Sequence, residues 1–127
     1  MSAAKLSDPN YVLLYVQNPA VSVTFYEGLL GKPPVENSPT FAMFALQSGV
    51  MLGLWARDTV EPKALAAGGS ELAFTLADAA SVKAVHADWQ RRGIAIAQPP
   101  TDMDFGHTCV GLDPDGHRLR AFAPAAQ

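Results

Sequence analysis

Tyr11-Val-Leu-Leu-Tyr-Val-Gln-Asn18 is a short apolar run that ends on a residue suited to capping a helix. A run of the same shape, Glu71-Leu-Ala-Phe-Thr-Leu-Ala-Asp78, begins 60 positions later in the chain. Runs of this length, rich in β-forming residues, predict buried strands. Because strand and cap recur together, the sequence predicts two copies of one structural module.

A helix is expected after each of these strands. Asn18 and Asp78 are good N-cap residues, and Pro19 suits the first helical position, where its missing N–H costs nothing. Gly31 and Gly93 are placed to end the two helices. The predicted buried stripes are Val21, Phe25 and Leu29 in the first helix and Val82, Val85 and Trp89 in the second.

Each helix is followed by three expected strands. Two of them form a hairpin, around Ser48-Gly49 in the first copy and around Asp113-Pro-Asp-Gly116 in the second. The hairpins are predicted at residues 41–46 with 50–56 and at residues 107–112 with 117–123, and a further short strand is expected at Val35 and at residues 94–97.

The pattern predicts an α+β fold of two tandem βαβββ modules in one structural domain. The first module spans residues 9–60, the linker residues 61–69 and the second module residues 70–124. Together the modules are expected to form a curved mixed sheet around a concave pocket, with the helices outside. Concave apolar surfaces are where small molecules bind.

The composition and net charge argue against a nucleic-acid or membrane partner. The chain has 127 residues, of which 49% are hydrophobic and 17% charged, as in an ordinary globular protein. A net charge of −3 offers no basic face, so we expect no nucleic-acid partner. No apolar stretch reaches the roughly 18 residues of a membrane span, and the first ten residues lack the apolar core of a signal peptide. The single cysteine, Cys109, fits a cytoplasmic location.

Two motifs resemble the vicinal oxygen chelate superfamily, which includes glyoxalase I, bleomycin and fosfomycin resistance proteins and extradiol dioxygenases. They are Val16-Gln-Asn-Pro-Ala-Val-Ser-Val-Thr-Phe-Tyr26 with Leu29-Leu-Gly31, and Asp113-Pro-Asp-Gly-His-Arg-Leu119. The likeness covers nearly the whole chain. It implies the glyoxalase/bleomycin resistance fold, and it implies a homodimer because members of the superfamily commonly dimerise.

A narrower resemblance is to the phenazine antibiotic resistance proteins of this superfamily. The segments that carry it are Tyr15-Val-Gln-Asn18, Leu52-Gly-Leu-Trp55 and Thr101-Asp-Met-Asp-Phe-Gly-His-Thr108. Members of that branch bind planar aromatic phenazines and lack the metal centre of the superfamily. The resemblance therefore implies a small aromatic ligand and no cofactor.

The superfamily's metal is held by His or Glu side chains, and the resemblance maps those positions onto Tyr11, Gly53, Glu71 and Arg120. Tyrosine is an uncommon ligand, glycine has no side chain, and arginine carries a fixed positive charge that repels a cation. A catalytic site needs about three protein ligands. Only Glu71 could serve, so we expect no metal.

The same mapping brings Arg120 and Glu71 toward one pocket. A charge pair there would leave guanidinium N–H groups for a carboxylate or carbonyl of a ligand. The alternative is that Arg120 points to solvent from an edge strand. The sequence leaves these two interpretations open.

Aromatic and sulfur-containing side chains are candidates for the rest of the pocket. Trp55 ends the first hairpin, where its indole could stack on an aromatic ligand or fill the core. Phe41 and Met43 lie on one face of their strand and Phe44 on the other. One of these sets should line the pocket, and the sequence does not decide which.

The second module adds candidates near its third strand. Asp102 and Phe105 fall in an expected loop that could cover the mouth of the pocket or simply connect two strands. His107 begins the next strand and could reach a ligand, although it has no identifiable partner for acid–base work.

The favoured hypothesis is a metal-free binding protein that sequesters a planar aromatic, phenazine-like antibiotic and confers resistance. The alternative is a metal-dependent enzyme of the same superfamily, such as a glyoxalase-like lyase or a dioxygenase. The missing ligand positions favour binding over catalysis. A third possibility, a metal-free domain with another substrate or a regulatory role, also stays open.

Overall fold

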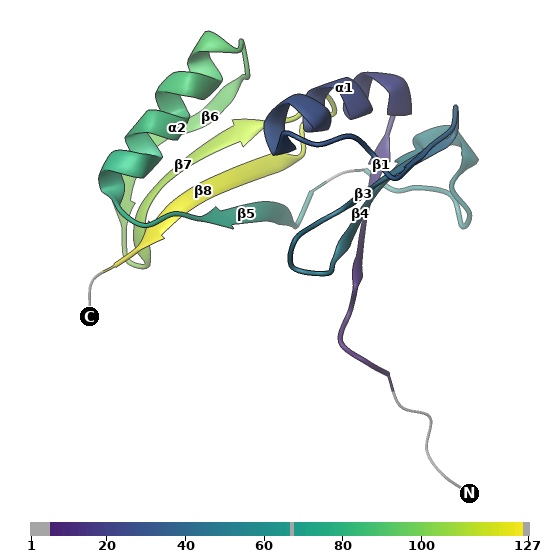
Figure 1. Ribbon diagram of the computed structural model, residues 1–127, viewed down its shortest axis with the longest axis horizontal. Coiled ribbons are helices and arrows are strands. Elements are labelled where there is room, and N and C mark those ends of the chain that lie inside the picture. Colours follow the sequence, from purple (N-terminus) through teal and green to yellow (C-terminus); the bar gives the residue numbers. More distant parts are fainter. Residues whose placement is uncertain (1–5, 67, 126–127) are drawn as a thin grey trace, which may run out of the picture. The chain divides into compact units, whose positions relative to one another are not determined.

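The computed structural model describes residues 6–66 and 68–125. These described residues form two compact units, divided between Leu65 and Ala66, and the described part of each unit contains one α-helix and one four-stranded mixed sheet (Figure 1). Neither described α-helix has the length and apolar character that crossing a membrane requires. The predicted α+β class and the order strand, helix, three strands are confirmed in both units.

In the first unit the sheet order is β1-β4-β3-β2, with β1 and β4 parallel and the other neighbours antiparallel. Helix α1 packs against β3 and β4. The elements are β1 (Tyr11–Val16), α1 (Pro19–Leu30), β2 (Glu36–Asn37), β3 (Phe41–Ala45), β4 (Met51–Ala56) and the short 3₁₀ helix η1 (Arg57–Thr59).

The second unit repeats this topology, with the order β5-β8-β7-β6 and β5 parallel to β8. Helix α2 crosses one face of the sheet, over β6, β7 and β8 (Figure 1). The elements are β5 (Glu71–Thr75), α2 (Ala79–Arg91), β6 (Ile96–Met103), β7 (Gly106–Leu112) and β8 (Arg118–Pro124).

The predicted helix caps are confirmed. The side-chain oxygen of Asn18 accepts a hydrogen bond from the Ala20 N–H at 3.0 Å, and that of Asp78 accepts one from the Ser81 N–H at 2.8 Å. Gly31 ends α1 in the left-handed conformation, with φ 72°, which only glycine adopts at no steric cost. These local signals fix where each helix begins.

The predicted buried stripe of α1 is wrong by about one position. Val21 is 51% exposed, and the buried residues Pro19, Ser22, Val23 and Tyr26 follow the helical repeat instead. Because α1 has apolar residues almost all round, its periodicity did not single out one face. In α2, where polar residues mark the outer side, Val82 and Trp89 are buried as predicted and Val85 is partly buried.

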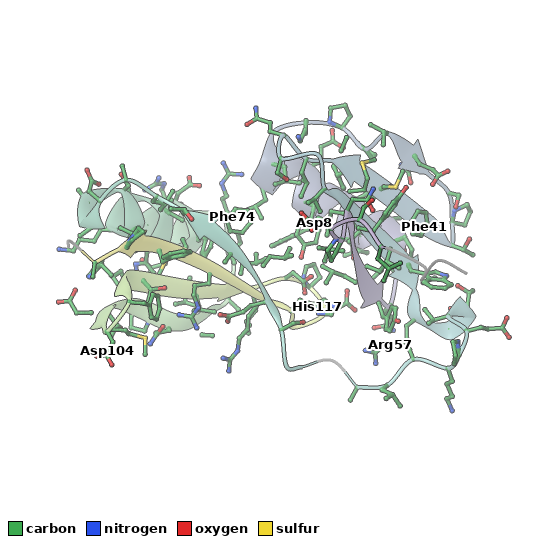
Figure 2. The ribbon with its side chains drawn as sticks, turned by 90° about the horizontal axis from the view of Figure 1, so that it is seen from below. Asp8, Phe41, Arg57, Phe74, Asp104 and His117 are labelled. Carbon is green, nitrogen blue, oxygen red and sulfur yellow. The ribbon has the colours of Figure 1, made fainter. Side chains whose placement is uncertain are left out.

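The expected strand at residues 94–97 begins two positions later and is much longer, and only the second half of the expected loop at residues 102–105 is a turn. Strand β6 continues to Met103, and a two-residue turn at Asp104 and Phe105 joins it to β7 (Figure 2 labels Asp104). The register shifts between Ile96 and Thr101. Pro99 and Pro100 lie there, and proline is tolerated because β6 is an edge strand.

Each sheet has a helix-covered face and an opposite face. Gly111 on β7 lies against the Trp89 ring of α2, so β7 residues separated from it by even numbers of positions also face the helix. Across from them on β8, Leu119 and Ala121 are buried. The residues between them on β8, including Arg120, therefore project from the opposite face.

Candidate functional site: an arginine pocket in the second unit

Arg120 does not point to solvent. Its strand, β8, is an inner strand between β5 and β7, and its side chain is only 17% exposed. Of the two interpretations that the sequence left open for Arg120, the structure supports the pocket residue and not the exposed edge residue. A fixed cation in such a position needs polar partners, because burying an unpaired charge is costly.

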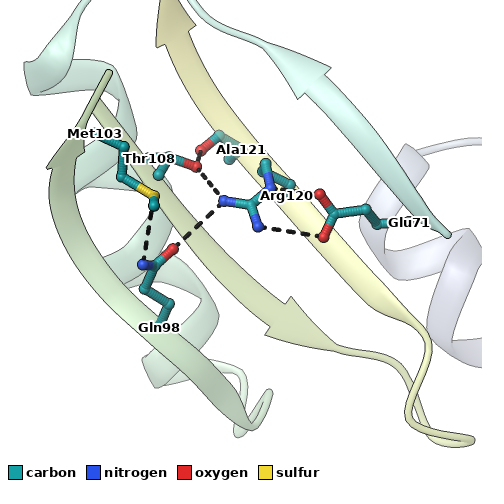
Figure 3. Close-up of polar contacts among 6 residues, drawn as sticks. All are labelled: Glu71, Gln98, Met103, Thr108, Arg120 and Ala121. Carbon is teal, nitrogen blue, oxygen red and sulfur yellow. Dashed lines mark hydrogen bonds and ion pairs between the residues drawn. The ribbon is translucent and has the colours of Figure 1, made fainter. Parts of the chain in front are cut away.

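Glu71 binds the guanidinium with both carboxylate oxygens. The Arg120 Nε donates to Oε1 at 2.5 Å, and Nη2 donates to Oε2 at 3.3 Å (Figure 3). The register of the parallel strands pairs Glu71 with Arg118, so the Glu71 side chain reaches diagonally to Arg120. A bidentate pair of this kind is shorter, stronger and more directional than a neutral hydrogen bond.

Two further side chains hold the other edge of the guanidinium. Arg120 Nη1 donates to Thr108 Oγ1 at 3.2 Å and to Gln98 Oε1 at 3.4 Å (Figure 3). The buried Thr108 hydroxyl donates to the Ala121 carbonyl at 3.1 Å, which leaves its lone pairs for Arg120. The Gln98 amide nitrogen lies 3.7 Å from the Met103 sulfur. The orientation of Arg120 is therefore set by side chains from three other strands.

Arg120 forms one wall of a pocket of about 310 Å³. Four hydrogen bonds use the guanidinium, whereas arginine carries five N–H groups, so one Nη2 hydrogen remains for a ligand. The volume lies at the lower end of the range of about 300–1,000 Å³ for small-molecule sites. The pocket is lined by Ala97, Gln98, Met103, Val110, Arg118 and Arg120.

An aromatic pair lies beside the guanidinium. The Arg120 Cζ atom is 5.7 Å from the centroid of the Phe105 ring, within the range of a cation–π contact. Phe105 also meets Phe122 edge to face, with ring centroids 5.9 Å apart. Phe105, expected in a rim loop, is thus placed next to Arg120 by the tight β6–β7 turn. It stays 45% exposed and offers surface to a flat ligand.

His107 and Asp102 lie together but not on the Arg120 face. His107 shares its face of β7 with Gly111, which lies against α2. Its Nδ1 is 2.6 Å from Asp102 Oδ1, and its Nε2 is buried without a hydrogen-bond partner among the described residues. The Asp102 side chain is 94% exposed. Strand alternation turns both side chains away from the Arg120 face, and their roles toward a ligand stay predictions.

The structure separates the aromatic candidates of the first unit. Phe44 is fully buried in the core. Phe41 and Met43 alternate with it and lie on the opposite, partly exposed face, where Phe41 pairs in register with Trp55. The Trp55 ring meets Tyr15 edge to face at 6.1 Å. Their roles toward a ligand stay predictions.

The residues at the superfamily's metal positions do not fit a metal centre. In the first unit, a Cβ atom added to Gly53 would lie 2.7 Å from Leu13 Cδ2 and 2.9 Å from Phe41 Cζ. Apolar side chains therefore occupy the space that a metal-binding side chain at position 53 would need. In the second unit, both Glu71 oxygens bind Arg120. The described residues contain no group of three or more His, Cys, Asp or Glu side chains that could hold an ion. Tyr11 is left without acidic or imidazole companions on β1.

The sequence did not predict five of the six lining residues, which are Ala97, Gln98, Met103, Val110 and Arg118. It also did not predict Thr108, which binds Arg120. Arg118 could have been found, because it stands two positions before Arg120 and strand alternation puts both on one face. Gln98 and Thr108 could not, because the register of β6 on β7 is irregular and no local signal sets it.

The sequence model of the Glyoxalase/Bleomycin resistance protein/Dioxygenase superfamily matches residues 9–121. The chain belongs to this superfamily. Both the family and the fold predicted from the sequence are thereby confirmed.

Individual relatives agree with this assignment. The phenazine antibiotic resistance protein EhpR of Enterobacter agglomerans is 32% identical over 116 residues, which are 88% of each chain. A protein of Agrobacterium tumefaciens solved by solution NMR is 49% identical, with a TM-score of 0.87, over 95% of this chain and all of that one. A glyoxalase/bleomycin resistance protein/dioxygenase from Nocardioides is 26% identical, with a TM-score of 0.76, over 97% of this chain and 86% of that one.

Proposed function

We propose that the protein binds a planar aromatic small molecule of the phenazine type and confers antibiotic resistance by sequestering it. The observation that carries this is the fixed, flat guanidinium of Arg120 on the wall of a 310 Å³ pocket, with the Phe105 ring beside it. The resemblance to a phenazine antibiotic resistance protein over most of the chain supports the same ligand class.

The chemistry of the pocket suits a flat heteroaromatic ring. Guanidinium and phenyl groups both stack on aromatic faces, and the remaining Nη2 hydrogen of Arg120 can bind a ring nitrogen or carbonyl. Val110 and Met103 supply apolar wall, and the thioether of methionine adapts to ligand shape. For the first unit we propose separately that the exposed part of the Trp55 indole offers an aromatic face to ligands of the same class.

The lining residues support binding without reaction. The six side chains belong to alanine, glutamine, methionine, valine and two arginines, and they include no carboxylate, imidazole, thiol or hydroxyl group. General acid–base catalysis requires a group whose pKa lies near the working pH. We therefore expect the bound compound to leave the pocket chemically unchanged.

A fluorescence titration with phenazine tests the proposal. Stacking on Trp55 should quench emission, and Trp55→Phe should remove that response while the buried Trp89 continues to emit. Isothermal titration tests the pocket of the second unit independently: Arg120→Gln should weaken phenazine binding, and the matched variant Arg91→Gln on the outer side of α2 should not. The recovered phenazine is then analysed by mass spectrometry. Absence of binding to the wild-type protein, or conversion of the compound, would contradict the proposal.

We further propose that the protein works in the cytoplasm as a homodimer. The lone Cys109 is buried and free, which supports a reducing compartment. The proposed dimer is supported by the resemblance to the superfamily, whose members commonly dimerise. Sedimentation velocity gives the mass directly, and a species of one chain mass at micromolar concentration would count against the dimer.

A further inference from the structure

We infer that the ligand of this pocket carries a carboxylate and that Arg118 binds it. The inference rests on the proposed function, because it names a group on the same ligand in the same pocket. Arg118 lines the pocket together with Arg120, and the two stand two positions apart on β8. Side chains so spaced project from one face of a strand, with Cα atoms roughly 6–7 Å apart.

The charges of the pocket leave Arg118 uncompensated. Glu71 lies opposite Arg118 in the register of β5 and β8, yet both of its carboxylate oxygens bind Arg120. Arg118 forms no ion pair with any residue that the structure describes. The remaining lining residues are neutral. Two guanidinium groups and one carboxylate leave a net positive charge at the pocket wall.

A ligand carboxylate matches this arrangement. The guanidinium fork binds a carboxylate through two parallel N–H···O bonds, which are about twice as strong as bonds between neutral groups. A cationic ligand would meet like charge there. The spacing on β8 lets a flat ring rest at Arg120 while a substituent on the ring reaches Arg118.

Three compounds test the inference by isothermal titration: a phenazine carboxylic acid, the corresponding carboxamide and unsubstituted phenazine. The wild-type protein should bind the acid about tenfold or more tightly than the carboxamide. Arg118→Gln should abolish that preference, so that the acid and the carboxamide bind with equal affinity. Arg118→Lys should retain part of it, because the charge remains and the fork is lost. Arg91→Gln, which removes an exposed arginine of α2, should leave the preference intact.

The outcomes separate this inference from the proposed function. If phenazine binds and the acid binds no better than the carboxamide, the inference is overturned and the proposed function stands. A preference for the acid that survives in Arg118→Gln assigns the carboxylate to another residue and also overturns the inference. If none of the three compounds binds, both fail. Thermal unfolding of Arg118→Gln provides the check on folding, and an unchanged midpoint is expected because the residue is exposed.

Discussion

Replacing Thr108 by valine should loosen Arg120 without changing any charge. The two side chains have nearly the same shape, but valine can neither donate to the Ala121 carbonyl nor accept from Arg120 Nη1. A hydrogen bond to a charged group contributes about 1.5–3 kcal/mol and one between neutral groups about 0.5–1.5 kcal/mol. Burial of the added methyl group stabilises the folded state by about 0.8 kcal/mol, which offsets part of this loss. We therefore expect a loss of about 2 kcal/mol in the free energy of unfolding.

Urea unfolding followed by circular dichroism measures this loss, and a thermal melt should show a midpoint lowered by roughly 6–10 °C. The matched control is Thr75→Val, the same substitution at an exposed position of β5 in the same sheet. If Thr108→Val is no less stable than Thr75→Val, the hydroxyl does not hold Arg120 and the reasoning fails. Phenazine affinity should fall in Thr108→Val and stay constant in the control.

Three other perturbations probe the fold. Gly106→Ala places a Cβ 2.0 Å from the Ala123 carbonyl oxygen at φ 150°, so urea unfolding should show a loss of about 3 kcal/mol or more; a loss below about 1 kcal/mol would contradict this. Burial raises the pKa of the Cys109 thiol, so its contribution to stability is present below the ordinary cysteine pKa and is lost as pH rises toward the raised value. A thiol reagent at pH 8 should therefore react far more slowly with the native protein than with the urea-unfolded one, and equal rates would refute this. The Ser81 hydroxyl and N–H lower the pKa of Asp78, so its contribution is present above the ordinary aspartate pKa and is lost as pH falls through the lowered one. Acid titration of stability should be flatter in Asp78→Asn than in the wild type.

The repeat and the helix boundaries could be predicted because their signals are local. The caps Asn18 and Asp78 and the turn at Asp113–Gly116 specify the conformation of a few neighbouring residues, whatever the rest of the chain does. The α1 stripe could not be predicted in the same way. Several of its faces are apolar, and only the packing against β3 and β4 chose the one that carries Tyr26.

The candidate site was predictable only in outline. The likeness to a family placed Glu71 and Arg120 near each other, and the structure joins them by an ion pair. The sequence could not assign faces, because an alternating pattern is unchanged when a strand is turned over. Helix packing made that choice: it placed Phe44 in the core of the first unit and His107 on the face of β7 that faces α2. Gln98 could not be predicted because the register of β6 on β7 is irregular, and pairing between strands depends on contacts far apart in the sequence.

The most direct test of the central claim is isothermal titration of phenazine into protein dialysed against a chelator, repeated after Fe²⁺, Mn²⁺, Ni²⁺ or Zn²⁺ is added back. The account predicts saturable binding of one phenazine per pocket, with the same dissociation constant in every sample, because Arg120 and not an ion faces the ligand. Failure of phenazine to bind, or binding that appears only when one of these metals is restored, would contradict the account.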